Sequence, residues 1–260
     1  MNRTIIDYKR IGSLPLEFES VLSGATVFDS SCSPEARVYF VDKDGGYYLK
    51  RSSVGALEKE AKMTAYFHSK GLSCEVISYL TDGGYDWMLT RRIEGEDCTH
   101  AQYLSEPRRL AILLGERLRE LHSLDFSGCP VQDRMKSYRA LAEENYARGA
   151  YDLSYFDGPS EVRAAWREIE ECGGSLSGRA LLHGDYCLPN VMFDDWRFSG
   201  FIDVGNGGVG DPHIDLYWGA WTLNFNLHTE DYRDVFFDAY GRDAVDLDKI
   251  RTVSAFECFG

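Results

Sequence analysis

The sequence predicts an α+β fold of two lobes, a small β-rich lobe over residues 1–92 and a larger, mainly helical lobe over residues 93–260. Two observations predict this fold class. Up to about residue 92, short runs of strand-forming residues alternate with glycine-containing turns. Beyond Gly95, apolar residues recur every three or four positions, which is the spacing of an amphipathic helix.

Turn residues separate the expected elements of the first lobe. The Lys-Asp-Gly-Gly stretch at 43–46 predicts a hairpin turn. Leu57, Ala61 and Ala65 share one face of a helical stretch that Gly71 ends. Strands are therefore expected at 35–40, 47–50, 74–80 and 87–90, and a helix is expected at 57–70.

The second lobe opens on a strong helical signal, in which Leu110, Leu114 and Leu118 recur at four-residue spacing. Apolar runs between residues 180 and 204 indicate a strand–loop–strand unit. Further helices are expected at 106–122, 135–147 and 160–171, and the chain from His213 onward is expected to be mostly helical.

The charge balance is acidic, with 28 Lys and Arg against 42 Asp and Glu and a net charge of −14. A nucleic-acid binder needs a basic surface that neutralises phosphates, and an anionic membrane also attracts basic segments. The composition therefore argues against both partners. It is compatible with a cationic small molecule, because an acidic surface concentrates positive ligands.

The sequence also favours a cytoplasmic protein. No stretch reaches the roughly 18–20 consecutive apolar residues of a membrane span, and the N-terminus lacks the apolar core of a signal peptide. Seven scattered cysteines without a Cys-x-x-Cys pair fit reduced thiols better than a disulfide framework or a zinc site.

The densest chemical signal is His-Gly-Asp-Tyr-Cys-Leu-Pro-Asn at 183–190, followed by Ile-Asp-Val-Gly at 202–205. Asn190 and Asp203 offer the amide and carboxylate oxygens that Mg²⁺ prefers. Asp185 is then available to orient an attacking hydroxyl and accept its proton. This division of labour is typical of the catalytic loop in phosphoryl transfer.

These motifs resemble the aminoglycoside phosphotransferase and choline kinase branch of the protein-kinase-like fold. Together with Ser-Gly-Phe-Ile-Asp at 199–203 and Glu-Cys-Phe at 257–259, they look most like aminoglycoside 3'-phosphotransferases. The resemblance extends over essentially the whole chain. It implies an ATP- and Mg²⁺-dependent enzyme that moves the γ-phosphate to a hydroxyl of an aminoglycoside, namely the 3'-hydroxyl, and so confers resistance.

The resemblance also implies a nucleotide-binding set in the first lobe. Lys50 is expected to grip the α- and β-phosphates, and Glu60 is expected to hold the Lys50 ammonium by an ion pair. The other expected contacts are Ser33 in a phosphate-covering loop, Tyr48 against the adenine, and Thr90 and Arg92 in the hinge, whose backbone reads the adenine edge.

In the second lobe the resemblance assigns Asp185 as the catalytic base and Asn190 and Asp203 as Mg²⁺ ligands. His183 is expected to brace the catalytic loop, and Asp215 to support that loop through backbone N–H groups. Three residues are candidates for contacting the ammonium groups of the acceptor: Glu257, Asp157 and Asn226.

Three departures from the family pattern concern the acceptor. Asn206 stands where relatives carry an arginine, and residues 219–226 carry fewer charges than in relatives. Phe259 is followed by Gly260, which displaces the terminal carboxylate by one residue. The nucleotide and metal sets remain, so these changes leave the identity of the acceptor open.

Alternatives remain at this point. A kinase of the same fold could act on a macrolide, choline, homoserine or a sugar. A metallohydrolase could use His183, Asp185, Asp203, His213 and Asp215 to activate water, and a catalytically idle binding protein is the third alternative.

The glycines at 205–210 formally match a dinucleotide-binding motif. Without a βαβ unit around them, they are interpreted as tight turns. The expected partner is one cationic aminoglycoside, with no nucleic acid or membrane, and the expected assembly is a monomer or weak homodimer.

Overall fold

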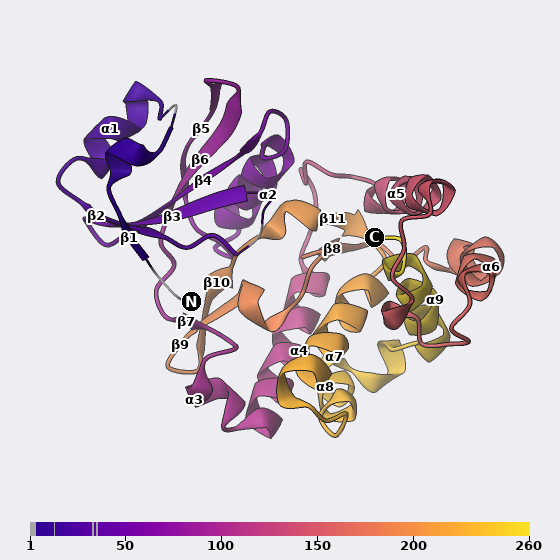
Figure 1. Cartoon of the computed structure of the whole chain (residues 1–260). Helices are drawn as coiled ribbons and strands as arrows, with labels where there is room; N and C mark the ends of the chain where they lie inside the picture. The colour runs from indigo at the N-terminus through magenta and orange to yellow at the C-terminus, as the bar shows by residue number, and fades with distance from the viewer. Residues whose placement is uncertain (1–3, 13, 33, 35) are drawn as a thin grey trace. The chain divides into compact units, whose positions relative to one another are not determined.

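The structure, a computed structural model, describes residues 4–12, 14–32, 34 and 36–260. The chain divides into two compact units (Figure 1). The first comprises the chain up to Gly95 together with Ser199–Gly205, and the second comprises Glu96–Phe198 and Asn206–Gly260. One unit is built on a β-sheet and the other mainly on helices, so the predicted α+β class is confirmed. The assignment of nucleotide binding to residues 1–92 and of acceptor binding to residues 93–260 stays a prediction.

The first unit contains a six-stranded sheet in the order β1-β2-β3-β4-β6-β5, in which all neighbours are antiparallel. Asp44, Gly45 and Gly46 all adopt positive φ, as the tight hairpin between β3 and β4 requires. The strands are β1 Thr4–Ile6, β2 Thr26–Asp29, β3 Ala36–Asp42, β4 Tyr47–Ser53, β5 Val76–Asp82 and β6 Tyr85–Arg91, and the helices are α1 Leu16–Leu22 and α2 Glu58–Ser69.

The alternation of side chains along β4 sends its residues to two different faces of the sheet. Tyr47 and Leu49 are buried in a core with Phe18 of α1 and Trp87 of β6. Lys50 points to the other face, on which α2 packs (Figure 1). The polar end of Lys50 is thereby directed toward α2 and away from the main core.

A buried carboxylate fixes the beginning of α2. Asp86 of β6 is fully buried and accepts hydrogen bonds from the Leu57 N–H at 3.1 Å and from Thr81 Oγ1 at 2.7 Å. Burial favours the neutral acid, but the hydrogen bonds outweigh it and lower the pKa of Asp86. The ionised Asp86 therefore satisfies a free N–H group at the helix start and anchors α2 to the sheet.

The second unit packs its helices around two small sheets. β8 pairs antiparallel with β11, and β9 lies between β7 and β10. The strands are β7 Glu96–Asp97, β8 Ala180–Leu182, β9 Val191–Asp194 and β11 Gly208–Gly210, together with β10 Arg197–Phe201, which begins in this unit and belongs to the first unit from Ser199 onward. The helices are α3 Ala101–Leu104, α4 Pro107–Ser123, α5 Arg134–Arg148, α6 Val162–Cys172, α7 His213–Leu227, α8 Arg233–Tyr240 and α9 Leu247–Glu257.

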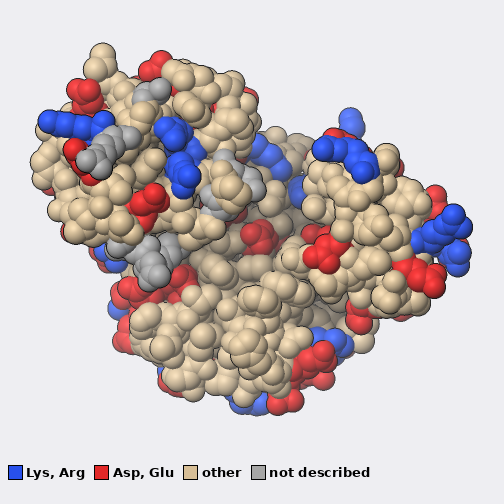
Figure 2. All heavy atoms as spheres, viewed as in Figure 1, with Lys and Arg blue, Asp and Glu red and all other residues tan. Residues whose placement is uncertain are grey.

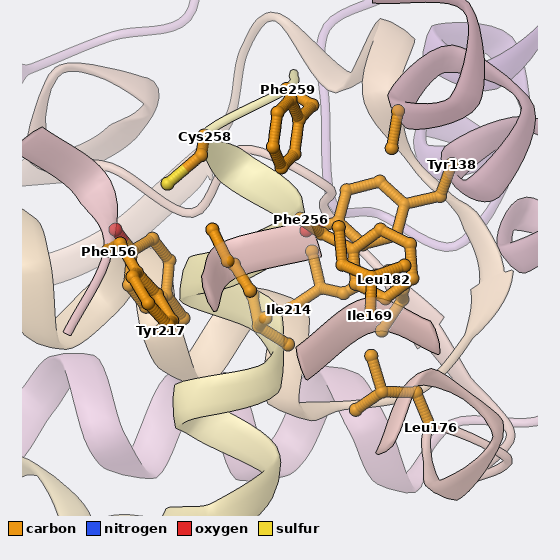
Figure 3. Packing of buried hydrophobic residues seen from close by; sticks show 14 of the residues in the cluster. Tyr138, Phe156, Ile169, Leu176, Leu182, Ile214, Tyr217, Phe256, Cys258 and Phe259 are labelled. Carbon is orange, nitrogen blue, oxygen red and sulfur yellow. The ribbon is translucent and has the colours of Figure 1, made fainter. Parts of the chain in front are cut away.

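The core of the second unit lies where α5, α6, α7, α9 and β8 meet (Figure 3). Tyr138 of α5 stacks on Phe256 of α9, with ring centroids 4.8 Å apart and planes 25° apart. Ile214 at the start of α7 and Leu182 at the end of β8 are fully buried in the same cluster. This packing fixes the end of β8, after which the catalytic motif begins.

The secondary structure departs from the sequence-based expectation in several places, and β1, β2, β7 and α3 are among the elements that the sequence does not single out. The first 92 residues include a helix, α1, that the strand-and-turn pattern does not predict. Residues 180–204 form three strands, β8, β9 and β10, instead of two. The interpretation of the glycine run as turns is wrong for Gly208–Gly210, which form β11 because β8 offers them a pairing partner.

The surface carries both signs of charge, and Figure 2 shows acidic and basic side chains interspersed over the visible face. None of the seven cysteines, all of which lie within the described ranges, forms a disulfide in this structure. Among the described residues, no helix combines the length and hydropathy that crossing a membrane requires.

Candidate active site

Lys50 and Glu60 form the ion pair that the sequence predicts. The Nζ of Lys50 lies 2.8 Å from both carboxylate oxygens of Glu60 and 2.9 Å from Oδ1 of Asp203. Burial alone would lower the pKa of Lys50, but the carboxylates of Asp203 and Glu60 outweigh it and raise that pKa. The ammonium is therefore held charged, between two acids of the first unit.

Asp203 follows the last residues of β10, which are tied to the loop after α2. The Phe201 N–H donates to the Leu72 carbonyl at 2.7 Å, and Ser73 Oγ donates to the Phe201 carbonyl at 2.7 Å. Asp203 itself has a φ of 54°, a left-handed conformation that costs a non-glycine residue energy. Its side chain remains about half exposed, so the carboxylate is accessible to a ligand.

Three of the other expected nucleotide contacts are described: Tyr48 lies on β4, Thr90 on β6 and Arg92 directly after β6. Tyr48 is the cross-strand partner of Thr90, and its ring lies 5.3 Å from that of Phe40. The Arg92 N–H donates to the Gly46 carbonyl at 3.0 Å. Ser33 lies outside the described residues.

In the second unit, Asn190 is hydrogen-bonded to the proposed base. Its Nδ2 donates to the Asp185 carbonyl at 3.0 Å and to Asp185 Oδ2 at 2.9 Å. Because the amide nitrogen faces Asp185, the amide oxygen faces away from it. Asn190 thus fixes the Asp185 carboxylate and retains an oxygen that can bind a cation.

Asp215 supports the catalytic loop as expected. It is fully buried and accepts hydrogen bonds from the backbone N–H groups of His183 and Gly184, each at 2.7 Å. The Asp185 N–H in turn donates to His183 Nδ1 at 3.3 Å. Both residues expected to be structural at the site therefore contact the catalytic loop.

His122 is a member of this network to which the sequence assigns no role. Its Nε2 lies 3.2 Å from Asp215 Oδ2, and its Nδ1 lies 2.9 Å from the Tyr240 hydroxyl. The Leu-His-Ser-Leu-Asp stretch at 121–125 is a signal that could have identified His122.

Gly184 is required by a close backbone contact. It has a φ of 84°, and a Cβ at this position would lie 2.1 Å from the Asn206 carbonyl oxygen. The same oxygen accepts a hydrogen bond from Nε of the buried Arg134 at 2.8 Å. Gly184 and Arg134 therefore hold the segment after Gly205 against the catalytic loop.

Glu257 is held by two aromatic residues that the sequence does not single out. Its Oε1 accepts hydrogen bonds from the Tyr138 hydroxyl at 2.5 Å and from Trp218 Nε1 at 3.1 Å. Burial raises the pKa of Glu257 to about 7, against the lowering effect of these bonds and with a further increase from the Asp185 charge. Glu257 therefore titrates near neutral pH, within electrostatic reach of the proposed base.

The remaining acceptor candidates make only local contacts. Asp157 is exposed, and its N–H donates to Ser254 Oγ at 3.1 Å. Nδ2 of Asn226 donates to the carbonyl and the Oγ1 of Thr222, one helical turn earlier. The Asn226 donor group is thus engaged by its own helix.

The contacts of His213 and Asp215 count against a metallohydrolase. His213 Nδ1 lies 2.7 Å from Asp211 Oδ1, and His213 Nε2 accepts from the Asp246 N–H at 3.0 Å. Both ring nitrogens are therefore used, as are both oxygens of Asp215. Within the described ranges, no group of three or more His, Cys, Asp or Glu side chains is arranged to hold a metal ion.

Comparison with known proteins agrees with this geometry. The model of the phosphotransferase enzyme family matches residues 30–252. A probable aminoglycoside 3'-phosphotransferase of Lactococcus lactis subsp. lactis (strain IL1403) is 47% identical over 252 residues, which cover 96% of each chain. The chain therefore belongs to the phosphotransferase enzyme family, in the group that contains aminoglycoside 3'-phosphotransferases.

Solved structures support the same fold. An aminoglycoside-3'-phosphotransferase of type VIII superposes with a TM-score of 0.77 at 23% identity, over 95% of this chain and 100% of that one. An aminoglycoside phosphotransferase from Streptomyces rimosus, in complex with ADP and streptomycin, superposes with a TM-score of 0.72 at 22% identity, over 98% of both chains. The predicted protein-kinase-like fold is confirmed.

Proposed function

We propose that this protein is an aminoglycoside 3'-phosphotransferase, which transfers the γ-phosphate of ATP to a hydroxyl of an aminoglycoside and thereby confers resistance. The observation that carries the proposal is the 47% identity to the Lactococcus lactis relative over 96% of both chains. The residues of the catalytic loop and the Lys50–Glu60 pair supply the chemistry that this reaction needs.

The nucleotide is held by the first unit. Lys50 binds the α- and β-phosphates as a point charge, and Glu60 orients it from α2. Tyr48 stacks on the adenine, Ser33 contacts a phosphate, and the backbone around Thr90 and Arg92 reads the adenine edge. The ADP complex of the Streptomyces rimosus neighbour supports a nucleotide as the co-substrate.

Asn190 and Asp203 are the proposed Mg²⁺ ligands. An amide oxygen and a carboxylate are the donor types that this ion prefers, and phosphates and waters complete its coordination. The orientation of Asn190, whose nitrogen is taken by Asp185, fits this role. When bound, the ion would neutralise negative charge on the β- and γ-phosphates.

Asp185 is the proposed catalytic base. Its carboxylate accepts a hydrogen bond from the acceptor hydroxyl, orients that oxygen for attack on the γ-phosphorus and takes the proton as the new P–O bond forms. The bond between the γ-phosphorus and the β–γ bridging oxygen breaks in the same transfer, and ADP leaves. Asn190 and the Asp215-supported backbone fix its position. Most of the rate enhancement then comes from positioning and electrostatics, since phosphoryl transfer asks for little covalent chemistry from the protein.

The acceptor is a cation, and acidic groups of the second unit bind it. Glu257 is the main candidate, because hydrogen bonds from the Tyr138 hydroxyl and Trp218 Nε1 fix the position of its carboxylate. Asp157 and Asn226 are further candidates in the same unit. We expect the enzyme to act in the cytoplasm, where ATP is present, as a monomer or weak homodimer.

An ADP-release assay with a panel of acceptors tests the proposal. The purified protein, ATP and MgCl₂ are combined in turn with kanamycin, neomycin, erythromycin and choline. We expect ADP release that depends on kanamycin or neomycin and is absent in Asp185→Ala. Release that depends on erythromycin or choline alone would identify a same-fold kinase for another hydroxyl, and hydrolysis without any acceptor would contradict transfer.

A further inference from the structure

Four aromatic side chains form a continuous row on the second unit, which we call the aromatic strip. It comprises Tyr155, from the loop before α6, with Trp218, Trp221 and Phe225 of α7. The two tryptophans and Phe225 are three and four positions apart, so they lie along one side of the helix.

Ring contacts link the members of the strip. Tyr155 lies 5.9 Å from Trp218 and 5.8 Å from Trp221, and the two tryptophans are 5.3 Å apart, measured between ring centroids. Phe225 lies flat on Trp221, with centroids 4.9 Å apart and planes 12° apart. The strip is therefore one connected surface.

Core packing accounts for only part of this row. Tyr155, Trp218 and Trp221 pack against the core of the second unit, but Phe225 is not part of that core and remains 61% exposed. Keeping an apolar ring in water is unfavourable, by roughly 25 cal/mol per Å² of apolar surface. One face of the Phe225 ring is covered by Trp221, and the side chain otherwise faces solvent.

The inner end of the strip adjoins the proposed acceptor-binding acid, and the helix that carries the strip also contacts the catalytic loop. Trp218 Nε1 donates to Glu257 Oε1 at 3.1 Å. Thr222, on the same helix, accepts a hydrogen bond from the Leu188 N–H of the catalytic loop at 3.1 Å. The strip thus leads from Glu257 at Trp218 along α7 to Phe225, on a helix that is tied to the catalytic loop through Thr222.

We propose that the aromatic strip binds an amino-bearing sugar ring of the acceptor, with Phe225 and Trp221 as its outer platform and Glu257 at its inner end. This inference rests on the proposed function and specifies how the acceptor is recognised. The faces of aromatic rings attract cations, with tryptophan the strongest, and they also cover apolar C–H surface.

Charge complementarity favours this occupant over an apolar partner. Glu257 lies at the inner end of the strip, and Asp157 lies two residues after Tyr155 on the same loop. Both groups favour a cation over an uncharged surface. Trp221 and Phe225 lie in the stretch 219–226, which contains no Asp, Glu, Lys or Arg, so aromatic faces are the groups that this part of α7 offers to a cation.

The test measures equilibrium binding of kanamycin and neomycin by calorimetry, in the presence of ADP, alongside turnover. Phe225→Ala is expected to weaken binding about fivefold, as loss of one exposed cation–π contact predicts. Phe225→Trp is expected to retain wild-type affinity. Phe225→Leu keeps the apolar volume without a π face and is expected to behave like Phe225→Ala. Leu247→Ala serves as the control, because Leu247 is another exposed apolar residue and lies at the first position of α9, at the opposite end of the helix from Glu257. This variant is expected to leave the affinity unchanged.

The outcomes separate this inference from the proposed function. Equal dissociation constants for wild type, Phe225→Ala and Phe225→Leu, with normal turnover, would overturn the proposal that the aromatic strip binds the acceptor. The proposed function would then still stand. Retained affinity in Phe225→Leu with a loss in Phe225→Ala would overturn an aromatic role in favour of a simple apolar contact. Binding without phosphorylated product would overturn the proposed function alone, and no binding by the wild type would overturn both.

Discussion

The Nζ of Lys50 lies 2.9 Å from Oδ1 of Asp203, although 153 positions separate the two residues in the chain. The same ammonium also contacts both carboxylate oxygens of Glu60. One cation therefore joins β4, α2 and the segment after β10. The first unit thus brings together the lysine and the carboxylate that are proposed to act on the phosphates and the metal.

Lys50 and Glu60 are expected to contribute to ATP binding as a pair and not independently of one another. Lys50→Ala and Glu60→Ala should each raise the KM for ATP by about tenfold or more, and the double variant should be little worse than the poorer single variant, because contacting residues are not additive. A double-mutant cycle on the KM for ATP measures this coupling. Lys62→Ala removes the partner of Glu58 from an exposed pair on the same helix and should change little. Independent, multiplying effects of the two alanine variants would contradict the account.

The anchor of α2 is expected to affect both stability and nucleotide binding. Asp86→Ala leaves the Leu57 N–H without its acceptor and should lower the free energy of unfolding by about 1–3 kcal/mol. It should also raise the KM for ATP, because α2 carries Glu60. Urea unfolding and ATP titration measure the two effects. Asp42→Ala, at an exposed position of β3, should stay within about 0.5 kcal/mol of wild type, and equal stability of the two variants would argue against the anchor.

Gly184 is expected to tolerate no side chain. In Gly184→Ala the new Cβ meets the Asn206 carbonyl oxygen at 2.1 Å, so the catalytic loop must shift. A displacement of about 1 Å costs about a hundredfold in rate, and kcat should fall by at least this factor. Gly174→Ala is the matched control, because a Cβ there meets no atom within 4 Å. Near-normal kcat in Gly184→Ala would show that the two segments are free to separate.

Glu257 is expected to make stability depend on pH. Its pKa is raised to about 7 from the ordinary value of 4.5, so the folded protein binds a proton more tightly than the unfolded chain. The stabilising contribution is present below about pH 4.5 and is lost as the pH rises to about 7, a decrease on the order of 3 kcal/mol. Thermal or urea unfolding between pH 4.5 and 8 measures the slope. Glu257→Gln should lack this contribution, and an identical pH dependence in the variant would refute it.

The same group is expected to control acceptor binding. A cationic acceptor prefers the ionised carboxylate, so the KM for kanamycin should rise as the pH falls below about 7, while the KM for ATP is unaffected by Glu257. In Glu257→Gln the KM for kanamycin should be high throughout and should lose this component of its pH dependence. A parallel rise of both KM values in the wild type would point to a general loss of structure instead.

Local sequence patterns predict much of the fold. The hairpin at 43–46 is recognisable because its residues favour positive φ, and α4 is recognisable because its leucines keep helical spacing over 17 residues. α1 is missed because it is short and has only two buried residues, Phe18 and Leu22. β11 is missed because strand formation by Gly208–Gly210 depends on pairing with β8 and not on local preference.

The candidate site is predictable to the extent that its residues lie in motifs. Lys50 and Glu60 are ten positions apart, and the structure joins them as expected. The two residues that donate hydrogen bonds to Glu257 are not predictable from the sequence, because Tyr138 and Trp218 look like ordinary aromatic core residues. Only tertiary packing brings their polar atoms to one carboxylate oxygen. The roles of the site residues in binding and catalysis stay predictions.

Phosphate transfer by an Asp185→Ala variant tests whether Asp185 is the base that takes the proton of the acceptor hydroxyl. The measurement compares ATP-dependent formation of phosphorylated kanamycin with the dissociation constant for ATP, in wild type, in Asp185→Ala and in Asp194→Ala as an exposed control. The account predicts that Asp185→Ala loses transfer by a factor of about 10²–10⁴ while ATP binding stays within about twofold of wild type. Transfer by Asp185→Ala at the wild-type rate would contradict the assignment of Asp185 as the catalytic base.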